Sequence, residues 1–365
     1  MISWPGASGA GATVGGVTSR PNLKDLSLER LREQLVSSGL RAFRAEQIAA
    51  WLYRRGVEDP AAMTDLPLVE RRRLESEFEI RALEVAAVDR SRDGTVKAAL
   101  QARDGSVVES VLIPEDERTT LCVSTQVGCP MACSFCATGF LGFTRNLTTA
   151  EIVDQVCRMR EVAADGQEIS NVVFMGMGEP LLNTDAVIEA VRLLVDPKAF
   201  AMAPRRVTVS TVGVVPQIER LLESVPVNLA VSLHATTDQV RDQLVPLNRR
   251  FPLEVLLGAL RRQKRLSARR PVFFEYTLIG GVNDGLADAR RLPGLLHGIP
   301  AKINLIPMNA HPDAAYDAPS EASVDRFMRE LAARGMTVTV RRSRGEDIQA
   351  ACGQLALRRT RESAA

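Results

Sequence analysis

Three cysteines lie close together in the segment VGCPMACSFC, and they could bind a metal ion or a metal cluster. Cys129, Cys133 and Cys136 are separated by three and two residues. Thiolates on one short loop can converge on a zinc or iron–sulfur centre. A structural zinc ion takes four ligands, and Cys122, seven residues upstream, could be the fourth. The spacing alone leaves open whether the site is closed or keeps one ligand position free.

Short apolar segments alternate with amphipathic helical segments from about residue 120 onward. Thr148 to Glu151 has the capping-box pattern that begins a helix. This alternation predicts parallel βαβ units, and their number fits a full or partial barrel better than a short open sheet. A doubly wound sheet remains the alternative. The apolar segments are LCVSTQ, NVVFMGMG, RVTVST, VNLAVSLH, VFFEYTLI, KINLIPMN and TVTVRR.

Polar or glycine-rich residues recur where these predicted strands end. In β/α barrels, ligands bind at the carboxyl ends of the strands. We therefore expect one site that gathers the loops of several strands. The cysteine segment follows the first predicted strand, GMGEP (176–180) the second, Ser210 lies at the third, Ser232 to His234 at the fourth, and Asn309 at the sixth.

The residues before the predicted barrel have a different character. Helical apolar spacing marks LSLERLREQLVSSGL, RAEQIAAWLYRRGV and LPLVERRRLESEF, and two Asp-Gly pairs then flank a strand-favouring run. The last residues carry Cys352 in AACGQL. We expect a disordered extension (1–24), a helical accessory domain (25–82), a β-meander linker (83–117), a partial barrel (118–345) and a C-terminal loop and tail (346–365).

The composition is that of an ordinary globular protein. The chain has 365 residues, a formal net charge of +2 and 45% hydrophobic residues. A basic run at 261–270 has the character of a solvated surface, but local charge can also attract a phosphate backbone. We find neither a signal-peptide pattern nor about 20 consecutive apolar residues. We expect a cytoplasmic protein whose cysteines are ligands or catalysts rather than disulfides.

The cysteine triad after the first predicted strand resembles the radical S-adenosylmethionine (SAM) superfamily, and GMGEP resembles that superfamily's Gly-Glu-Pro segment. Further segments resemble the RlmN family of dual-specificity adenine-C2 RNA methyltransferases over residues 25 to 357. They include CATGFLGFTRNLTTAEI, VFMGMGEPLLN, LAVSLHAT, INLIPMN and RGEDIQAACGQL. The resemblance implies an α/β fold: a partial (β/α)6-type barrel with a small N-terminal helical domain and a short β meander.

The resemblance also implies the cofactors. Cys129, Cys133 and Cys136 would hold a 4Fe-4S cluster with one open iron, to which SAM would bind, and each turnover would use two SAM molecules. The positions that match the family's SAM contacts are Gly178, Glu179, Ser210, Ser232, Leu233, His234 and Asn309.

Three catalytic residues follow from the same resemblance. Cys352 would first accept a methyl group from SAM, and hydrogen abstraction from that methyl would allow its carbon to add to C2 of adenine. Glu109 would remove the C2 proton. Cys122 would then attack the sulfur of Cys352, forming a disulfide and releasing the methylated base. This role removes Cys122 from the candidate zinc ligands.

The implied partners are 23S rRNA, tRNA with the adenine in the anticodon-loop region, and a reductant protein such as a flavodoxin. We expect no membrane contact and a monomer. The helical domain and the 261–270 run are the candidate RNA contacts. Cys157 is expected in the core, and His297 and His311 at the surface or in loops. The alternatives are a C8-methylating rRNA adenine methyltransferase and, from another class, a zinc-stabilised RNA-binding protein.

Overall fold

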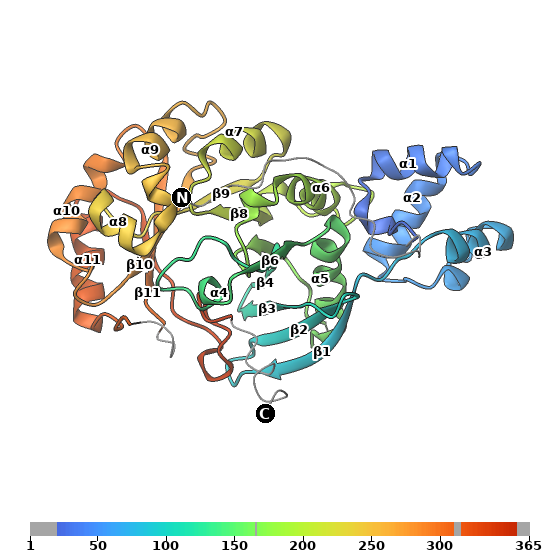
Figure 1. The fold of residues 1–365 in the computed structure, drawn as a ribbon, viewed down its shortest axis with the longest axis horizontal. Helices are drawn as coiled ribbons and strands as arrows, with labels where there is room; N and C mark the ends of the chain where they lie inside the picture. The colour runs from blue at the N-terminus through green and yellow to red at the C-terminus, as the bar shows by residue number, and fades with distance from the viewer. Residues whose placement is uncertain (1–19, 165, 310–314, 356–365) are drawn as a thin grey trace.

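A ten-stranded mixed sheet forms the centre of the molecule (Figure 1). The computed structural model describes residues 20–164, 166–309 and 315–355. His311 and the two ends of the chain, 1–19 and 356–365, lie outside the described residues. None of the helices in those ranges combines the length and apolar character needed to cross a bilayer.

Parallel strands make up the larger part of this sheet, and their order follows the order of the chain. A doubly wound sheet reverses its strand order at a switch point, so the singly wound order rules out that alternative. The expected partial barrel is confirmed. Its strands are β4 (Arg118–Cys122), β7 (Asn171–Phe174), β8 (Val207–Thr211), β9 (Asn228–Ser232), β10 (Val272–Leu278), β11 (Ala301–Pro307) and β12 (Val338–Val340).

A helical layer covers the outside of the parallel strands (Figure 1). The Thr148 hydroxyl accepts from the Glu151 N–H while the Glu151 carboxylate accepts from the Thr148 N–H, so the predicted capping box is confirmed. Both faces of β8, β9 and β10 are largely buried, which explains their nearly continuous apolar sequences. The helices are α5 (Thr149–Val162), α6 (Thr184–Val195), α7 (Val215–Ser224), α8 (Asp238–Leu244), α9 (Leu253–Arg261), α10 (Leu286–Leu295) and α11 (Glu321–Ala333).

The predicted meander continues the same sheet at its other edge. β1 (Leu83–Arg90), β2 (Val96–Ala102) and β3 (Val107–Glu115) pair antiparallel, and β3 pairs antiparallel with β4. Gly94 and Gly105 have positive φ in the two connecting turns, as their Asp-Gly sequences predict. The meander is therefore joined directly to the first strand of the barrel.

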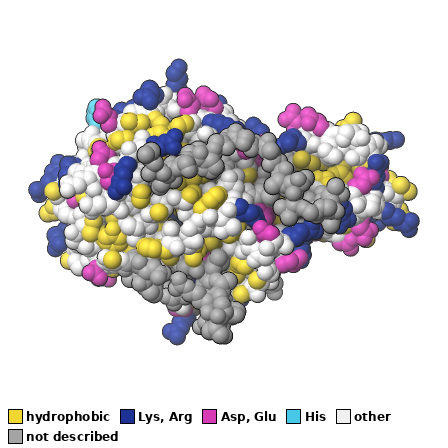
Figure 2. Space-filling view, in the orientation of Figure 1, with side chains coloured by type: hydrophobic (Ala, Val, Ile, Leu, Met, Phe, Trp, Pro, Cys, Tyr) yellow, Lys and Arg dark blue, Asp and Glu magenta, His cyan; other side chains and the backbone are white. Residues whose placement is uncertain are grey.

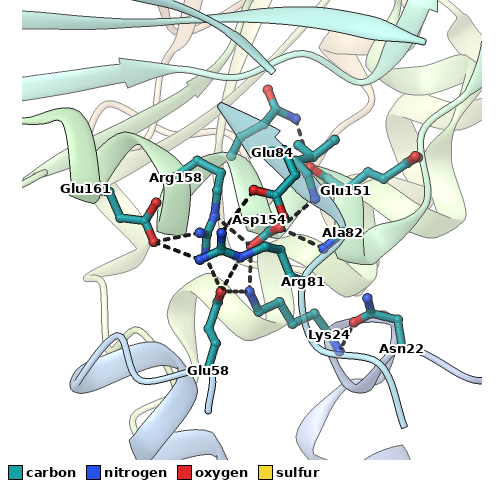
Figure 3. Close-up of polar contacts among 12 residues, drawn as sticks. Asn22, Lys24, Glu58, Arg81, Ala82, Glu84, Glu151, Asp154, Arg158 and Glu161 are labelled. Carbon is teal, nitrogen blue, oxygen red and sulfur yellow. Dashed lines mark hydrogen bonds and ion pairs between the residues drawn. The ribbon is translucent and has the colours of Figure 1, made fainter. Parts of the chain in front are cut away.

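The N-terminal helices project from one end of the barrel (Figure 1). They are α1 (Leu28–Ser37), α2 (Arg44–Ala49) and α3 (Leu68–Glu77). Lys24, which precedes them, is fully buried and forms ion pairs with Glu58 and with Asp154 of α5 (Figure 3). Arg158 of α5 also pairs with Glu58, so these charges connect the helices to the barrel. Cys157 is buried in the core as expected, beside these charges.

Candidate active site

The cysteine segment forms a packed loop between two short strands, β5 (Gln126–Gly128) and β6 (Phe143–Asn146), and contains α4 (Ala137–Phe140). The Cys129 N–H donates to the carbonyl of Gly142 at 2.7 Å. Gly128 has φ +74, and a Cβ there would lie 1.9 Å from the same carbonyl oxygen, so glycine is required. Cys133 is buried against apolar side chains that include Ile279. The backbone thus fixes where the three thiols lie.

The spacing of the sulfur atoms argues against a closed zinc site. Tetrahedral zinc with four thiolates places its sulfur atoms about 3.8 Å apart. Among the described residues, the one group of three or more metal-binding side chains whose ligand atoms all lie within 4.8 Å is Glu58, Asp154 and Cys157. The cysteine triad is therefore spread more widely, whether or not Cys122 is included.

The three thiols are also strongly desolvated. Burial raises the pKa of Cys129 to about 12, and the neighbouring Cys136 adds to the effect. Burial likewise raises the pKa of Cys133 well above its ordinary value, as do the other two thiols. Burial raises the pKa of Cys136. Thiolates at these positions need positive charge beside them, which a metal centre supplies.

The GMGEP segment approaches this loop as closely as glycine allows. Gly178 has φ +98, and a Cβ there would lie 2.5 Å from the Cβ of Gln126. The Glu179 carboxylate is buried and accepts from the N–H groups of Leu181 and Val212, at 2.9 and 2.8 Å. Burial outweighs these hydrogen bonds and raises the pKa of Glu179 to about 7. Glu179 thereby ties the end of β7 to the end of β8.

The residues of β8 and β9 that were predicted to contact SAM lie beside Glu179. Ser210 is buried, directly opposite Ala230 in the neighbouring strand. Ser232 ends β9, Leu233 is fully buried, and the Leu233 N–H donates to the carbonyl of Glu275 at 3.0 Å.

His234 lies at this strand end in a left-handed conformation, with φ +57. Its Nδ1 accepts a hydrogen bond from the N–H of Thr277 at 3.0 Å. Burial, aided by the nearby charge of Arg241, lowers the pKa of His234 to about 3. The ring is therefore neutral at physiological pH, with Nδ1 as an acceptor.

Arg241 of α8 organises these strand ends, although its sequence position did not single it out. Its guanidinium is buried and donates to the carbonyls of Val212, Ser232 and Leu233, at 2.7 to 3.0 Å. It therefore satisfies backbone acceptors that follow two neighbouring strands. An arginine on an otherwise amphipathic helix carries no sequence signal of burial.

Asn309 and Cys352 are brought into direct contact. The Asn309 Nδ2 donates to the carbonyl of Cys352 at 3.1 Å. The loop that carries Cys352 also packs on α4, since the Ala137 N–H donates to the Gly353 carbonyl at 2.7 Å and the Thr138 hydroxyl to the Leu355 carbonyl at 2.8 Å. The C-terminal loop therefore lies against the cysteine loop, beside Cys136.

The C-terminal loop is also attached to the meander. Asp93 accepts from the Gly345 N–H at 2.9 Å, and Asp347 accepts from the Ser91 hydroxyl at 2.6 Å. These contacts fix the loop between the β1–β2 turn and α4. Figure 1 shows the red C-terminal segment running beside the ends of β1 and β2.

Besides the triad, the site contains two further thiols, those of Cys122 and Cys352. Burial and the nearby Cys352 raise the pKa of Cys122 to about 12, against a hydrogen bond from the Met175 N–H. Cys352 is accessible to solvent, yet the surrounding protein displaces enough water to raise its pKa to about 11. Arg341 opposes both shifts with its positive charge. The charge of Cys352 thus acts on Cys122, while Cys352 itself is also affected by Cys136 of the triad.

A row of polar residues crosses four strands beneath these thiols. Ser232, Glu275, Asn304 and Thr339 are consecutive partners in the register of β9 to β12, so their side chains share one face. The Oε1 of Glu275 accepts from Asn304 at 2.8 Å, and Oε2 lies 3.6 Å from Nη1 of Arg341. The sequence could have indicated this row, because Glu275 interrupts the apolar segment VFFEYTLI.

Glu109 lies on β3 and its carboxylate is buried. Its backbone carbonyl accepts from the Ser124 hydroxyl at 2.7 Å, and that hydroxyl accepts from the Met177 N–H at 2.8 Å. This bridge joins β3 to the GMGEP segment. Lys97 of β2 places Nζ 3.3 Å from Oε1 of Glu109. Lys97, like Glu275, is a charged residue inside an otherwise apolar strand.

The basic run 261–270 is not part of this site. It lies between α9 and the start of β10, at the amino ends of the parallel strands. Arg261 donates to the carbonyls of Leu295 and His297, and His297 is exposed after α10, as expected. Contact between the run and RNA stays a prediction, for a surface separate from the cysteine loop.

Family models match two parts of the chain. Residues 123–292 match the radical SAM superfamily, and residues 21–80 match the N-terminal domain of ribosomal RNA large subunit methyltransferases. A solved structure of a radical SAM methyltransferase from Sphaerobacter thermophilus is similar over 92% of this chain and 99% of its own, with 46% identity and a TM-score of 0.86.

Curated relatives extend the similarity over nearly the whole length. A protein of Geobacter sulfurreducens named dual-specificity RNA methyltransferase RlmN is 52% identical over 92% of this chain and 91% of its own. A protein of the same name from Geotalea uraniireducens is 49% identical over 92% of this chain and 96% of its own. With both family models matched in the expected order, the chain belongs to the RlmN family within the radical SAM superfamily.

Proposed function

We propose that this protein methylates C2 of an adenine in 23S rRNA and of an adenine in the anticodon-loop region of tRNAs. The observation that carries the proposal is the position of the Cys352 loop. This loop packs on α4, immediately after Cys136, and leaves Cys352 accessible beside Cys122. A methyl carrier, a resolving thiol and a candidate cluster loop thus lie together, which ordinary SAM methyl transfer does not need.

Membership of the radical SAM superfamily implies SAM and a 4Fe-4S cluster. Cys129, Cys133 and Cys136 would hold the cluster, since all three lie on one loop within the matched radical SAM segment and pack in one apolar cluster. The bound cluster and SAM would supply the radical that removes a hydrogen atom from methylated Cys352. Two SAM molecules would be used in each turnover, one as methyl donor and one as radical source. The strand-end residues Ser210, Ser232 and His234 would line the SAM pocket.

The remaining steps belong to side chains of this chain. Carbon 2 of adenine has no lone pair with which to attack a sulfonium, so the thiol of Cys352 would accept the methyl group and lose its proton. Its methylene carbon would then bond to C2, and the unpaired electron of this adduct would return to the cluster. Glu109 would take the C2 proton on its buried carboxylate. The Cys122 thiol would lose its proton and attack the Cys352 sulfur, breaking the bond to the transferred carbon and leaving a disulfide; the released carbon keeps the bonding pair and takes up a proton to become the methyl group.

The product distinguishes this reaction from its nearest alternative, methylation of adenine C8. RNA treated with the protein, SAM and a reductant should be digested to nucleosides and separated by mass spectrometry against both standards. We expect 2-methyladenosine. The 8-methyl isomer would overturn the proposed position.

Protein purified without oxygen should also contain iron and sulfide, whereas a colourless protein with one zinc ion would support the zinc-stabilised RNA-binding protein.

RNA contacts are proposed for the helical accessory domain, residues 25–82. Its surface carries basic, acidic and hydrophobic side chains close together (Figure 2). An adenine in a duplex hides C2 in the minor groove, so the protein would need an unpaired or extruded base. Charge reversal at exposed basic residues of this domain should weaken RNA binding without changing cluster content. We also propose that a flavodoxin-like protein supplies the electrons and that this protein is a monomer.

A further inference from the structure

Lys97 and Glu109 form a buried ion pair on the strands that precede the barrel. The distance from Lys97 Nζ to Glu109 Oε1 is 3.3 Å. The side chain of Lys97 is 10% exposed and that of Glu109 is 5% exposed. Removing two charges from water is costly, and a fold retains such a pair where the charges have a use or are well compensated.

The strand register places this pair on the same face as the resolving cysteine. Lys97 is directly opposite Val111, and Val111 is directly opposite Cys122. Directly opposed residues of antiparallel strands share a face, and Glu109 shares the face of Val111 because it lies two residues away. Lys97 thus reaches Glu109 along the diagonal of the β2–β3 pair. The proposed proton acceptor, its cation and Cys122 face one side of the sheet.

A proton acceptor in this position has an electrostatic difficulty. A carboxylate removed from water tends to become protonated, and a protonated carboxyl cannot accept the C2 proton. Lys97 Nζ, 3.3 Å away, gives this buried carboxylate a positively charged partner in place of lost water. The ion pair also limits the orientations of the Glu109 side chain.

We propose that Lys97 is a positioning residue for the methylation reaction, which pairs with the Glu109 carboxylate and holds it oriented toward C2 of the bound adenine. This inference rests on the proposed function. In the step concerned, the C2–H bond breaks, the proton moves to a Glu109 oxygen, and the electron pair of that bond stays with the adenine, while the unpaired electron left by the radical addition would pass to the oxidised cluster that the family implies. Lys97 keeps its own proton throughout, so the pair changes from charged–charged to charged–neutral.

Other ionisable groups adjoin the pair. Asp89 of β1 lies directly opposite Lys97 on the side away from β3. Cys122 lies on the same face, and the C-terminal loop and β12 bring Cys352 and Arg341 toward Cys122. A substitution at Lys97 leaves all of these groups in place.

The test uses Lys97→Met and Lys97→Arg in the anaerobically reconstituted protein. Methylation is followed over pH at saturating RNA, together with iron content, methylation of Cys352, and formation of 5′-deoxyadenosine. We expect Lys97→Met to lower RNA methylation on the order of tenfold to a hundredfold at neutral pH. Lys97→Arg, which keeps a positive charge beside Glu109, should restore most of the lost activity.

The covalent intermediate gives a second readout. If the C2 proton is removed slowly, the protein–RNA adduct through Cys352 should persist, and denaturing gels should show more of it in Lys97→Met than in the unchanged protein. In a Glu109→Gln background, Lys97→Met should have no further effect, because the two residues act together. Lys198→Met is the matched control, since it removes an exposed Lys–Glu pair of 3.2 Å with Glu46.

Each outcome bears on the proposal. Full RNA methylation in Lys97→Met would overturn the inference, and an equal loss of iron and of 5′-deoxyadenosine formation would assign Lys97 a structural role and overturn it too. Independent effects of Lys97→Met and Glu109→Gln would also overturn it. These results differ from failure of the proposed function, in which the unchanged protein itself would produce no 2-methyladenosine.

Discussion

Asn309 holds the backbone of Cys352, with 3.1 Å between its Nδ2 and the Cys352 carbonyl oxygen. The Ser343 hydroxyl donates to Oδ1 of the same amide, which fixes its orientation. The end of β11 is thereby joined to the C-terminal loop at the residue proposed to carry the methyl group. A position that matches a family SAM contact has a second role here, as a support for the methyl carrier.

Asn309→Ala should lower the extent of Cys352 methylation in the purified protein by about fivefold, the equivalent of one neutral hydrogen bond. Intact-protein mass spectrometry measures this extent. Iron content should be unchanged, because the side chain of Asn309 hydrogen-bonds to Cys352 and Ser343, which lie outside the cysteine loop. A full level of Cys352 methylation in the variant would show that the remaining loop contacts suffice.

Asp93→Ala should release the C-terminal loop from the β1–β2 turn. Burial works to raise the pKa of Asp93, but hydrogen bonds from Gly345, Thr95 and Ser91 outweigh it and hold the pKa at about 2, below the ordinary value of 3.8. A lowered carboxyl pKa stabilises the folded state above pH 4, and this contribution is lost as the pH falls from about 4 toward 2.

Hydrogen exchange at Gly345 measures this attachment. The Gly345 N–H should be protected at pH 5 and should lose protection toward pH 2 before the barrel strands do. In Asp93→Ala the same amide should exchange rapidly at all these pH values, and RNA methylation should fall while iron content is retained. Equal protection in the variant and the unchanged protein would contradict an anchoring role for Asp93.

Variants of Cys122 and Cys352 should stop the reaction at different steps. Cys352→Ala should retain the cluster and SAM cleavage but produce no methylated RNA, since it lacks the methyl carrier. Cys122→Ala should accumulate protein covalently bound to RNA, because no thiol is available to release the product. Gel electrophoresis under denaturing conditions separates these outcomes. Cys157→Ala, in the core of α5, is the control and should do neither.

Asp154→Ala should loosen the N-terminal helices from the barrel. Its Oδ2 accepts from the N–H groups of Ala82 and Leu83, each at 2.8 Å, and its other oxygen pairs with Lys24. Removing one partner of a buried ion pair costs about 3 to 5 kcal/mol of stability. Thermal unfolding should occur at a lower temperature. Arg32→Ala, which removes an exposed pair, should cost less than about 1 kcal/mol.

The same charges predict a loss of stability at high pH. Burial opposes the charge of Lys24, but Cys157, Asp154 and Glu58 outweigh it and raise its pKa from 10.5 to about 12. A raised lysine pKa stabilises the folded state below about pH 10.5, and this contribution disappears as the pH rises through 12. Lys24→Met should therefore show a flatter stability profile above pH 10 in denaturant titrations. An unchanged slope would contradict this assignment.

The sequence alone was sufficient to predict the succession of strands and helices and a loop that carries three neighbouring cysteines, whereas the roles of Cys122 and Cys352 came from the family resemblance and stay predictions. Cys129, Cys133 and Cys136 are close in the chain, so their convergence depends only on a short loop. The capping box at Thr148 and Glu151 and the apolar periods of the strands are likewise local patterns. Such features depend on residues within one or two turns of each other, and a sequence displays them directly.

The tertiary structure alone decided which distant groups meet. Gly345 and Asp93 are 252 residues apart, and their hydrogen bond depends on the paths of β1, β2 and the C-terminal loop. The pairing of Lys97 with Glu109 required the register of two strands, which a one-residue shift would have destroyed. Contacts of this kind arise from packing and strand register, so the spacing of residues along the chain does not encode them.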